Sequence, residues 1–109
     1  MQKQVEDTIN LLITAFKNQF DDFHGLYLYG LFTDGKNHKD EDIEIIAIFD
    51  IENKFKRELI WPIVGKIETD LDVFIDLNPI TMEELKKDEE LYDEVINRGI
   101  FFGVVESSK

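Results

Sequence analysis

Two acidic side chains at the start of a predicted strand are the residues in this chain best suited to chemistry. Asp42 and Glu44 open the segment of residues 42–49 (DIEIIAIF), directly after a polar loop at residues 33–41. Because residues two apart on a strand point to the same face, we expect the two carboxylates to lie side by side. Hard oxygen ligands of this kind suit a divalent cation. The pair therefore forms a candidate metal site.

A third carboxylate is expected from residues 71–77 (LDVFIDL), which alternate between polar and apolar and are predicted to form a strand. Asp72 and Asp76 both lie on its polar face. A helix separates this segment from residues 42–49, so if the two strands pair we expect them to be parallel, with their starts side by side. Asp42 lies at the start of its strand, which favours Asp72, and Asp76 remains the alternative. Three carboxylates could hold two metal ions for in-line phosphoryl chemistry.

The remaining segments alternate between helical and strand patterns. The predicted helices cover about residues 3–20, 55–67 and 81–99, and the predicted strands cover residues 26–32, 42–49, 71–77 and 100–105. Pro62 should start, kink or split the second helix because it lacks a backbone donor. Asn78-Pro79 should end the third strand, and Thr81 with Glu84 forms a capping-box pattern. This order predicts an α+β (mixed α/β) fold, a small mixed sheet backed by helices, in a single domain spanning residues 1–109.

Composition limits the class of partner. The chain has 24 acidic and 12 basic residues, a formal net charge of -12 and no cysteine. Non-specific affinity for nucleic acids comes mostly from Lys and Arg, so a long DNA or RNA substrate is disfavoured, whereas a small nucleotide is not. No segment approaches the roughly 20 apolar residues of a membrane helix. We therefore expect a cytoplasmic protein without a membrane segment.

The motif spacing resembles that of the DNA polymerase β-like nucleotidyltransferase superfamily, and in particular its minimal nucleotidyltransferases (MNT), over about residues 26–102. Members carry Gly-Ser at the end of the first core strand, Asp-x-Asp on the next strand and a further Asp on a later strand. Here ten residues, 32–41, separate the two motifs. The matching positions are Gly30, Leu31 in place of the serine, Asp42, Glu44 in place of the second aspartate, and Asp72 or Asp76.

The resemblance implies a nucleotidyltransferase fold and the transfer of a nucleoside monophosphate, with AMP from ATP as the expected case, to a hydroxyl on a protein or small molecule. Asp72 would also assist the attacking hydroxyl. The implied ligands of Mg²⁺ or Mn²⁺ are Asp42, Glu44 and Asp72, or Asp76 in its place. The residues implied to contact the nucleotide are Gly30, Leu31, Lys36 and Lys39.

The resemblance also implies a partner protein. Small stand-alone members of the family often act as antitoxins that adenylylate an all-helical HEPN toxin. A HEPN-type partner and a hetero-oligomer, or a homo-oligomer, would follow.

Two departures from the family pattern leave other functions open. Leu31 offers no hydroxyl to a phosphate. Glu44 is one methylene longer than aspartate, which moves a ligand by about 1 Å, enough to matter where geometry is critical. A second hypothesis is therefore a catalytically degenerate homologue that acts as a binding or inhibitory module. A third is an unrelated acidic α/β domain whose carboxylates are ordinary surface residues.

Overall fold

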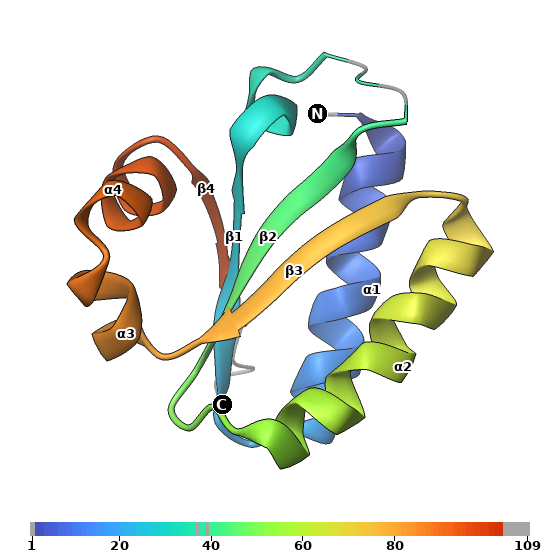
Figure 1. The fold of residues 1–109 in the computed structure, drawn as a ribbon. Coiled ribbons are helices and arrows are strands. Elements are labelled where there is room, and N and C mark those ends of the chain that lie inside the picture. The colour runs from blue at the N-terminus through green and yellow to red at the C-terminus, as the bar shows by residue number, and fades with distance from the viewer. Residues whose placement is uncertain (1, 37, 39, 104–109) are drawn as a thin grey trace, which may run out of the picture.

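The computed structural model describes residues 2–36, 38 and 40–103, which form a four-stranded sheet with helices on both faces (Figure 1). The elements in chain order are α1 Lys3–Gln19, β1 Phe23–Tyr29, the 3₁₀ helix η1 Gly30–Asp34, β2 Asp42–Phe49, α2 Lys54–Leu71, β3 Phe74–Ile80, α3 Met82–Lys87, α4 Glu89–Tyr92, the π-helical turn η2 Asp93–Asn97 and β4 Ile100–Gly103.

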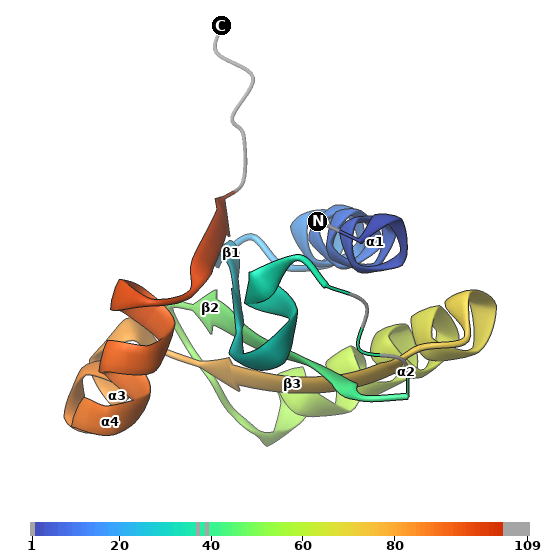
Figure 2. The same ribbon diagram turned by 90° about the horizontal axis from the view of Figure 1, so that it is seen from above.

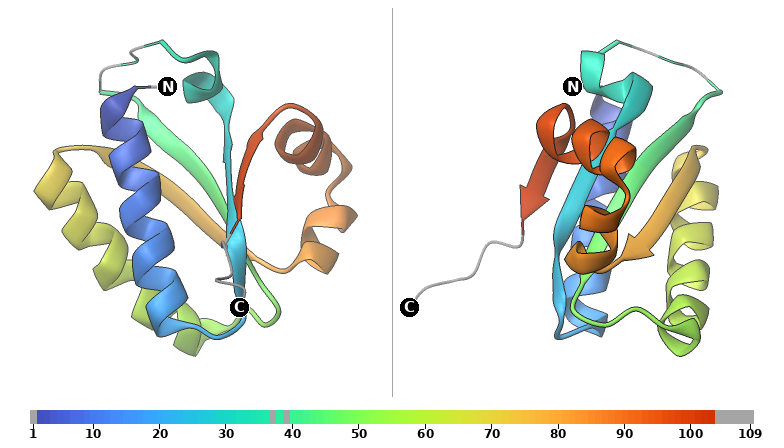
Figure 3. Two further views of the ribbon diagram at one scale, coloured as in Figure 1. Left: turned by 180° about the vertical axis from the view of Figure 1, so that it is seen from behind. Right: turned by 60° about the vertical axis from the view of Figure 1, so that its left-hand side comes forward.

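The sheet has the order β3-β2-β1-β4 and is mixed. β1 pairs antiparallel with both β2 and β4, whereas β2 and β3 are parallel, as the intervening helix predicted. The helices α1 and α2 pack beside each other on one face of the sheet, and α3 and α4 lie over the other face (Figures 2 and 3). The α+β fold with a small mixed sheet is therefore confirmed.

Each face of the sheet carries its own apolar core. The larger core joins the sheet to α1 and α2; its fully buried members include Leu12, Phe16, Leu26, Leu28, Ile45, Ala47 and Ile60. The smaller core joins the sheet to the C-terminal helices; its buried members are Ile46, Ile48, Leu85 and Val95. β2 supplies side chains to both cores, so its later half is covered on both faces of the sheet.

The first half of the chain follows the predicted elements closely, with one shift. α1 and β2 have the predicted bounds to within one residue. β1 lies three residues earlier than predicted, because Gly30 adopts a left-handed backbone with φ of +80° and starts η1. α2 continues through Pro62 and neither starts nor splits there. Pro62 lies on the exposed side of the helix, where water can hydrogen-bond the carbonyl that lacks its usual partner.

The prediction for the third strand was wrong in its bounds. β3 begins at Phe74 rather than at residue 71, because α2 extends to Leu71 and Asp72 caps it in a left-handed conformation with φ of +53°. Asn78-Pro79 lies within the strand instead of ending it. β3 is an edge strand, where proline is tolerated because one side of the strand needs no donor.

The C-terminal helix is divided where a single helix was predicted. The capping box of Thr81 and Glu84 begins α3 as expected. The helical path then breaks at Asp88, whose carboxylate accepts a hydrogen bond from the Leu91 amide at 3.2 Å and starts α4. β4 covers residues 100–103, while residues 104 and 105 of the predicted strand lie outside the described residues. No helix within the described part of the chain is both long and apolar enough to cross a bilayer.

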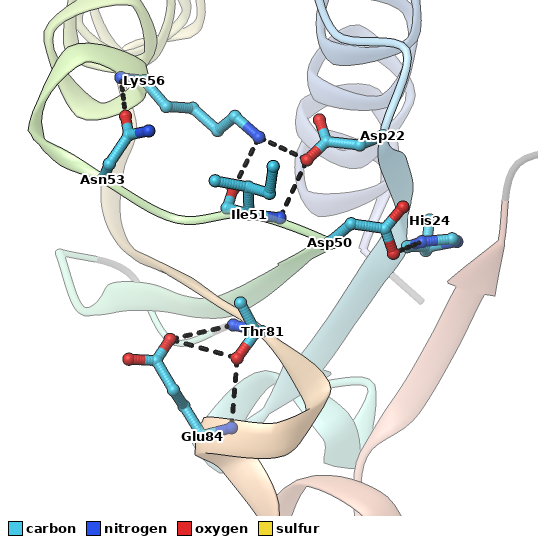
Figure 4. A network of polar contacts seen from close by, with 8 residues as sticks. All are labelled: Asp22, His24, Asp50, Ile51, Asn53, Lys56, Thr81 and Glu84. Carbon is cyan, nitrogen blue, oxygen red and sulfur yellow. Dashed lines mark hydrogen bonds and ion pairs between the residues drawn. The ribbon is translucent and has the colours of Figure 1, made fainter.

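Lys56 anchors the start of α2 to the sheet (Figure 4). Its Nζ donates to Asp22 Oδ2 at 2.5 Å and to the Ile51 carbonyl at 2.6 Å, and it lies 4.6 Å from the centre of the Phe49 ring. Asn53 caps the same helix by accepting from the Lys56 amide at 2.9 Å. These contacts set where the α2 crossover leaves β2, and the crossover leads to β3.

Candidate active site

The parallel pair of β2 and β3 brings three carboxylates to one end of the sheet. In the register of the two strands, Glu44 lies opposite Asp76 and Asp42 lies opposite Phe74. Asp42 and Glu44 share a face of β2 with Ile46 and Ile48, because side chains alternate along a strand. Ile46 and Ile48 are covered by the C-terminal helices, whereas Asp42 is exposed and Glu44 half-buried. The carboxylates therefore occupy the uncovered end of an otherwise buried face.

These side chains line a hollow of about 330 Å³, which we call the carboxylate hollow. Its lining residues are Leu31, Asp40, Glu41, Asp42, Glu44 and Asp76. Asp72 is not among them. It lies at the C-cap of α2 and lines an adjoining hollow, which shares Asp40 and Glu41 with the first. The structure thus brings Asp76, the alternative named from the sequence, together with Asp42 and Glu44, while Asp72, the favoured residue, lines the adjoining hollow.

Leu31 lines the carboxylate hollow, and Gly30 lies next to it in the chain and beside Glu44. η1 packs on β2, and Gly30 lies so close to the Glu44 carboxylate that a side chain at position 30 would overlap it. The Gly30 carbonyl accepts a hydrogen bond from Thr33 Oγ1 at 2.8 Å, which holds the first turn of η1. Leu31 is 47% exposed and is part of the wall of the hollow. The position where the family has its serine is therefore within the site.

A second hollow of about 510 Å³ adjoins the first, and we call it the Arg98 hollow. Its walls include Gly30, Leu31, Thr33, Glu44, Glu94 and Arg98. Leu31 and Glu44 line both hollows, so the two are neighbours. Glu94 and Arg98 were not singled out from the sequence. Their placement depends on η2 and the turn after it, which return the chain toward η1, and no local spacing signals this.

The site is strongly negative. Burial, followed by the charges of Glu94, Asp76 and Asp42, raises the pKa of the Glu44 carboxyl above its ordinary value. Burial and the charges of Glu44, Asp76 and Glu94 likewise raise the pKa of the nearby Tyr29 to about 12. Both shifts have the same physical meaning, since each group resists adding another negative charge to this end of the sheet. A bound cation would relieve this repulsion.

The donor set fits a divalent cation in its chemistry. Asp42, Glu44 and Asp76 offer only hard carboxylate oxygens, which Mg²⁺ and Mn²⁺ prefer. Among residues 2–36, 38 and 40–103, no three acidic or histidine side chains are grouped closely enough to hold an ion. The three side chains would therefore have to turn toward one another to share one.

Of the two lysines expected to contact the phosphates, only Lys36 lies within the described residues. Lys36 follows η1, and its amide donates to Asp34 Oδ1 at 2.7 Å. Its side chain is not part of the wall of either hollow. Lys39 lies outside the described residues.

Comparison with known proteins supports the fold. No family model and no curated protein sequence matches this chain. Solved structures do match. A chain of the toxin–antitoxin pair MntA–HpeT, in a mutant with two aspartates changed to glutamate, has a TM-score of 0.65 at 23% identity, covering 87% of this chain and 73% of that one.

Two further structures are similar. A toxin–antitoxin structure with AMP-PNP gives a TM-score of 0.64 at 23% identity, covering 87% of this chain and 73% of that chain. A complex of tri-AMPylated Shewanella oneidensis HEPN toxin with MNT antitoxin gives a TM-score of 0.60 at 20% identity, covering 92% and 73% respectively. At this level of identity the likeness establishes the fold, and the nucleotidyltransferase fold implied by the resemblance is confirmed.

Proposed function

We propose that this chain is a minimal nucleotidyltransferase that transfers AMP from ATP to a hydroxyl of a partner protein, and that the partner is a HEPN-type toxin. The observation that carries the proposal is the meeting of Asp42, Glu44 and Asp76 at one hollow, with Gly30 close against the Glu44 carboxylate. The similar structures support the partner and the nucleotide, because they include a toxin–antitoxin complex with AMP-PNP and an AMPylated HEPN toxin.

The chemistry would proceed in one displacement. The acceptor hydroxyl oxygen attacks the α-phosphorus of ATP, the bond from that phosphorus to the bridging oxygen of the β-phosphate breaks, and pyrophosphate leaves. Asp76 takes the hydroxyl proton, in the role that the resemblance implied for Asp72, because Asp76 lies opposite Glu44. Asp42 and Glu44 would hold Mg²⁺ or Mn²⁺. When bound, such an ion offsets the charge of the phosphates and orients them for in-line attack.

The charge of the chain is consistent with a protein acceptor. With a net charge of -12, the surface repels long nucleic acids and suits a partner that is itself basic, such as a toxin that cuts RNA. The expected assembly is a hetero-oligomer of the two proteins.

The second candidate is a catalytically degenerate homologue that only binds and inhibits its partner. Leu31 favours this alternative. It places an apolar side chain, 47% exposed, at the position where the family has a hydroxyl. Glu44 also favours this alternative. Its side chain is longer than the aspartate of the family, and its carboxylate lies against Gly30.

Calorimetry with α,β-methylene-ATP and Mg²⁺ or Mn²⁺ tests the nucleotide site without turnover. We expect metal-dependent binding that is abolished by Asp42→Ala. The matched control is Asp70→Ala, which removes an exposed carboxylate on α2 that pairs with Lys66. Circular dichroism should show that both variants fold. If the wild-type chain binds no nucleotide, the transferase proposal fails and the degenerate module is favoured.

Transfer is measured separately. ATP labelled at the α-phosphate is incubated with the chain and a HEPN protein, and label on the HEPN protein identifies the transferase. Nucleotide binding without labelling, in the presence of either metal, would favour the degenerate module.

A further inference from the structure

Arg98 is the basic side chain placed to meet a nucleotide's phosphates. It lies at the end of η2 and lines the hollow beside the carboxylates. Among the described residues that line the carboxylate hollow and the Arg98 hollow, no other is basic. The walls near Arg98 are otherwise acidic, because Glu44, Glu94 and Asp34 all contribute. A polyphosphate entering there would find its complementary charge at Arg98 alone within these walls.

The present partner of Arg98 holds it only weakly. Its Nη2 lies 3.3 Å from Asp93 Oδ2, and the two side chains are 69% and 57% exposed. Exposed ion pairs of this kind contribute little to stability, so the guanidinium can exchange Asp93 for another anion. Its planar fork of donors matches a phosphate in a bidentate manner, which a lysine cannot do.

The positions of the two hollows indicate where each phosphate of the nucleotide would lie. In the proposed transfer, the α-phosphorus must reach the hydroxyl at the carboxylate hollow, beside Asp42 and Asp76. The phosphates that leave then extend to one side. The Arg98 hollow is the adjoining space, since it shares Leu31 and Glu44 with the first.

We propose that Arg98 exchanges Asp93 for the β- and γ-phosphates of the bound nucleoside triphosphate and so binds the group that leaves as pyrophosphate. This inference rests on the proposed function. It gives the site a guanidinium from the C-terminal part of the fold, in a chain where Leu31 provides no hydroxyl to the phosphates.

Calorimetry with two ligands tests this assignment. α,β-Methylene-ATP and AMP are titrated, each with Mg²⁺, into the wild-type chain, Arg98→Ala and Arg98→Lys. A hydrogen bond to a charged group corresponds to roughly 10- to 100-fold in affinity, and we expect Arg98→Ala to lose this much for the triphosphate. Arg98→Lys should recover part of it. AMP lacks the two phosphates in question, so its affinity should be unchanged.

The control is Arg57→Ala, which removes an arginine that pairs with Glu52 and lines neither hollow, and which should leave both affinities unchanged. Circular dichroism and thermal unfolding confirm that the variants fold, as expected for an exposed residue. Equal triphosphate affinity in wild type and Arg98→Ala overturns the inference, and so does an equal loss for AMP. If the wild type binds the triphosphate and Asp42→Ala does not, the proposed nucleotide site stands. Either of the two contrary results for Arg98→Ala then rules out only the role of Arg98. No binding by the wild type sinks the proposed function as well.

Discussion

Gly30 and the Glu44 carboxylate are in such close contact that no β-carbon fits between them. The contact joins the first residue of η1 to one of the proposed metal ligands. Gly30 is constrained a second time by its own backbone, whose φ of +80° disfavours any side chain. The glycine of the motif is therefore explained by both conformation and space in this chain.

Gly30→Ala should destabilise the fold more than the equivalent change at Gly35. Gly35 has nearly the same φ, +77°, but a β-carbon there would meet no atom within 4 Å. We expect Gly35→Ala to cost only the backbone term, roughly 1–2 kcal/mol. Gly30→Ala should cost the same term and about 0.5–1.5 kcal/mol more, because the end of the Glu44 side chain must turn away from the added methyl group. Urea unfolding followed by circular dichroism measures both free energies.

A double-mutant cycle isolates the contact. In a Glu44→Ala background the overlap is gone, so Ala at position 30 should cost no more than Ala at position 35. An unchanged cost in that background would show that Glu44 is not what excludes a side chain at position 30.

The stability of the protein should depend on pH through Glu44. The pKa of this carboxyl is raised in the folded state above its ordinary value of 4.5. The protein is therefore most stable with respect to this group when Glu44 is protonated. This contribution to the free energy of unfolding is fully present below pH 4.5 and is lost as the pH rises through the folded pKa. Glu44→Gln should be more stable than wild type at pH 7, and the difference should disappear toward pH 4.

Unfolding in urea at several pH values between 4 and 8 measures this difference. The exposed Glu58 on α2 provides the control, and Glu58→Gln should show no such convergence. A Glu44→Gln advantage that stays constant across the whole range would contradict the raised pKa.

Local sequence patterns predicted the elements whose positions depend only on neighbouring residues. The nearly continuous apolar residues that follow the acidic start of residues 42–49 predicted β2, strand geometry predicted the shared face of Asp42 and Glu44, and the capping box predicted the start of α3. The bounds of β3 could not be found in this way. Residues 71–77 alternate as a strand should, but α2 continues to Leu71 and its cap takes Asp72.

The sequence favoured Asp72 over the alternative Asp76 for the same reason. Placing β3 three residues too early put Asp72 beside Asp42, whereas the true register puts Asp76 beside Glu44. Register across a crossover depends on how far the intervening helix extends, and the helix end at Leu71 has no strong stop signal in the sequence. Glu94 and Arg98 come to the site through η2, a π-helical turn that no apolar spacing predicts.

Lys56 should contribute far more to stability than an exposed lysine. Its side chain is only 11% exposed and its partner Asp22 only 23%. Burial acts to raise the pKa of Asp22, but the hydrogen bond and charge of Lys56, together with the Ile51 amide, lower it overall. Lys56→Met would leave this carboxylate without its cation, so we expect a loss of about 2–4 kcal/mol at pH 7.

Lys66→Met is the matched change, because Lys66 pairs with Asp70 on the exposed side of the same helix. Its cost should be at most about 0.5 kcal/mol in the same urea titration. Similar losses for the two variants would mean that the Lys56 contacts of Figure 4 do not anchor α2.

Leu31→Ser should strengthen nucleotide binding. Leu31 lines both hollows and is half exposed, so its replacement should barely change stability. A serine there would offer the hydroxyl that the family uses, and a neutral hydrogen bond of roughly 0.5–1.5 kcal/mol corresponds to about 2- to 12-fold in affinity. Calorimetry with α,β-methylene-ATP and Mg²⁺ measures the change.

Leu31→Ala separates the hydroxyl from the space that the leucine leaves. If only the serine variant binds more tightly, the phosphates lie within reach of position 31, and the leucine is a loss that the rest of the site tolerates. If alanine and serine give the same gain, the leucine acts by obstructing the hollow. If neither variant gains, the phosphates do not approach position 31, and the correspondence between Leu31 and the family's serine has no functional meaning in this chain.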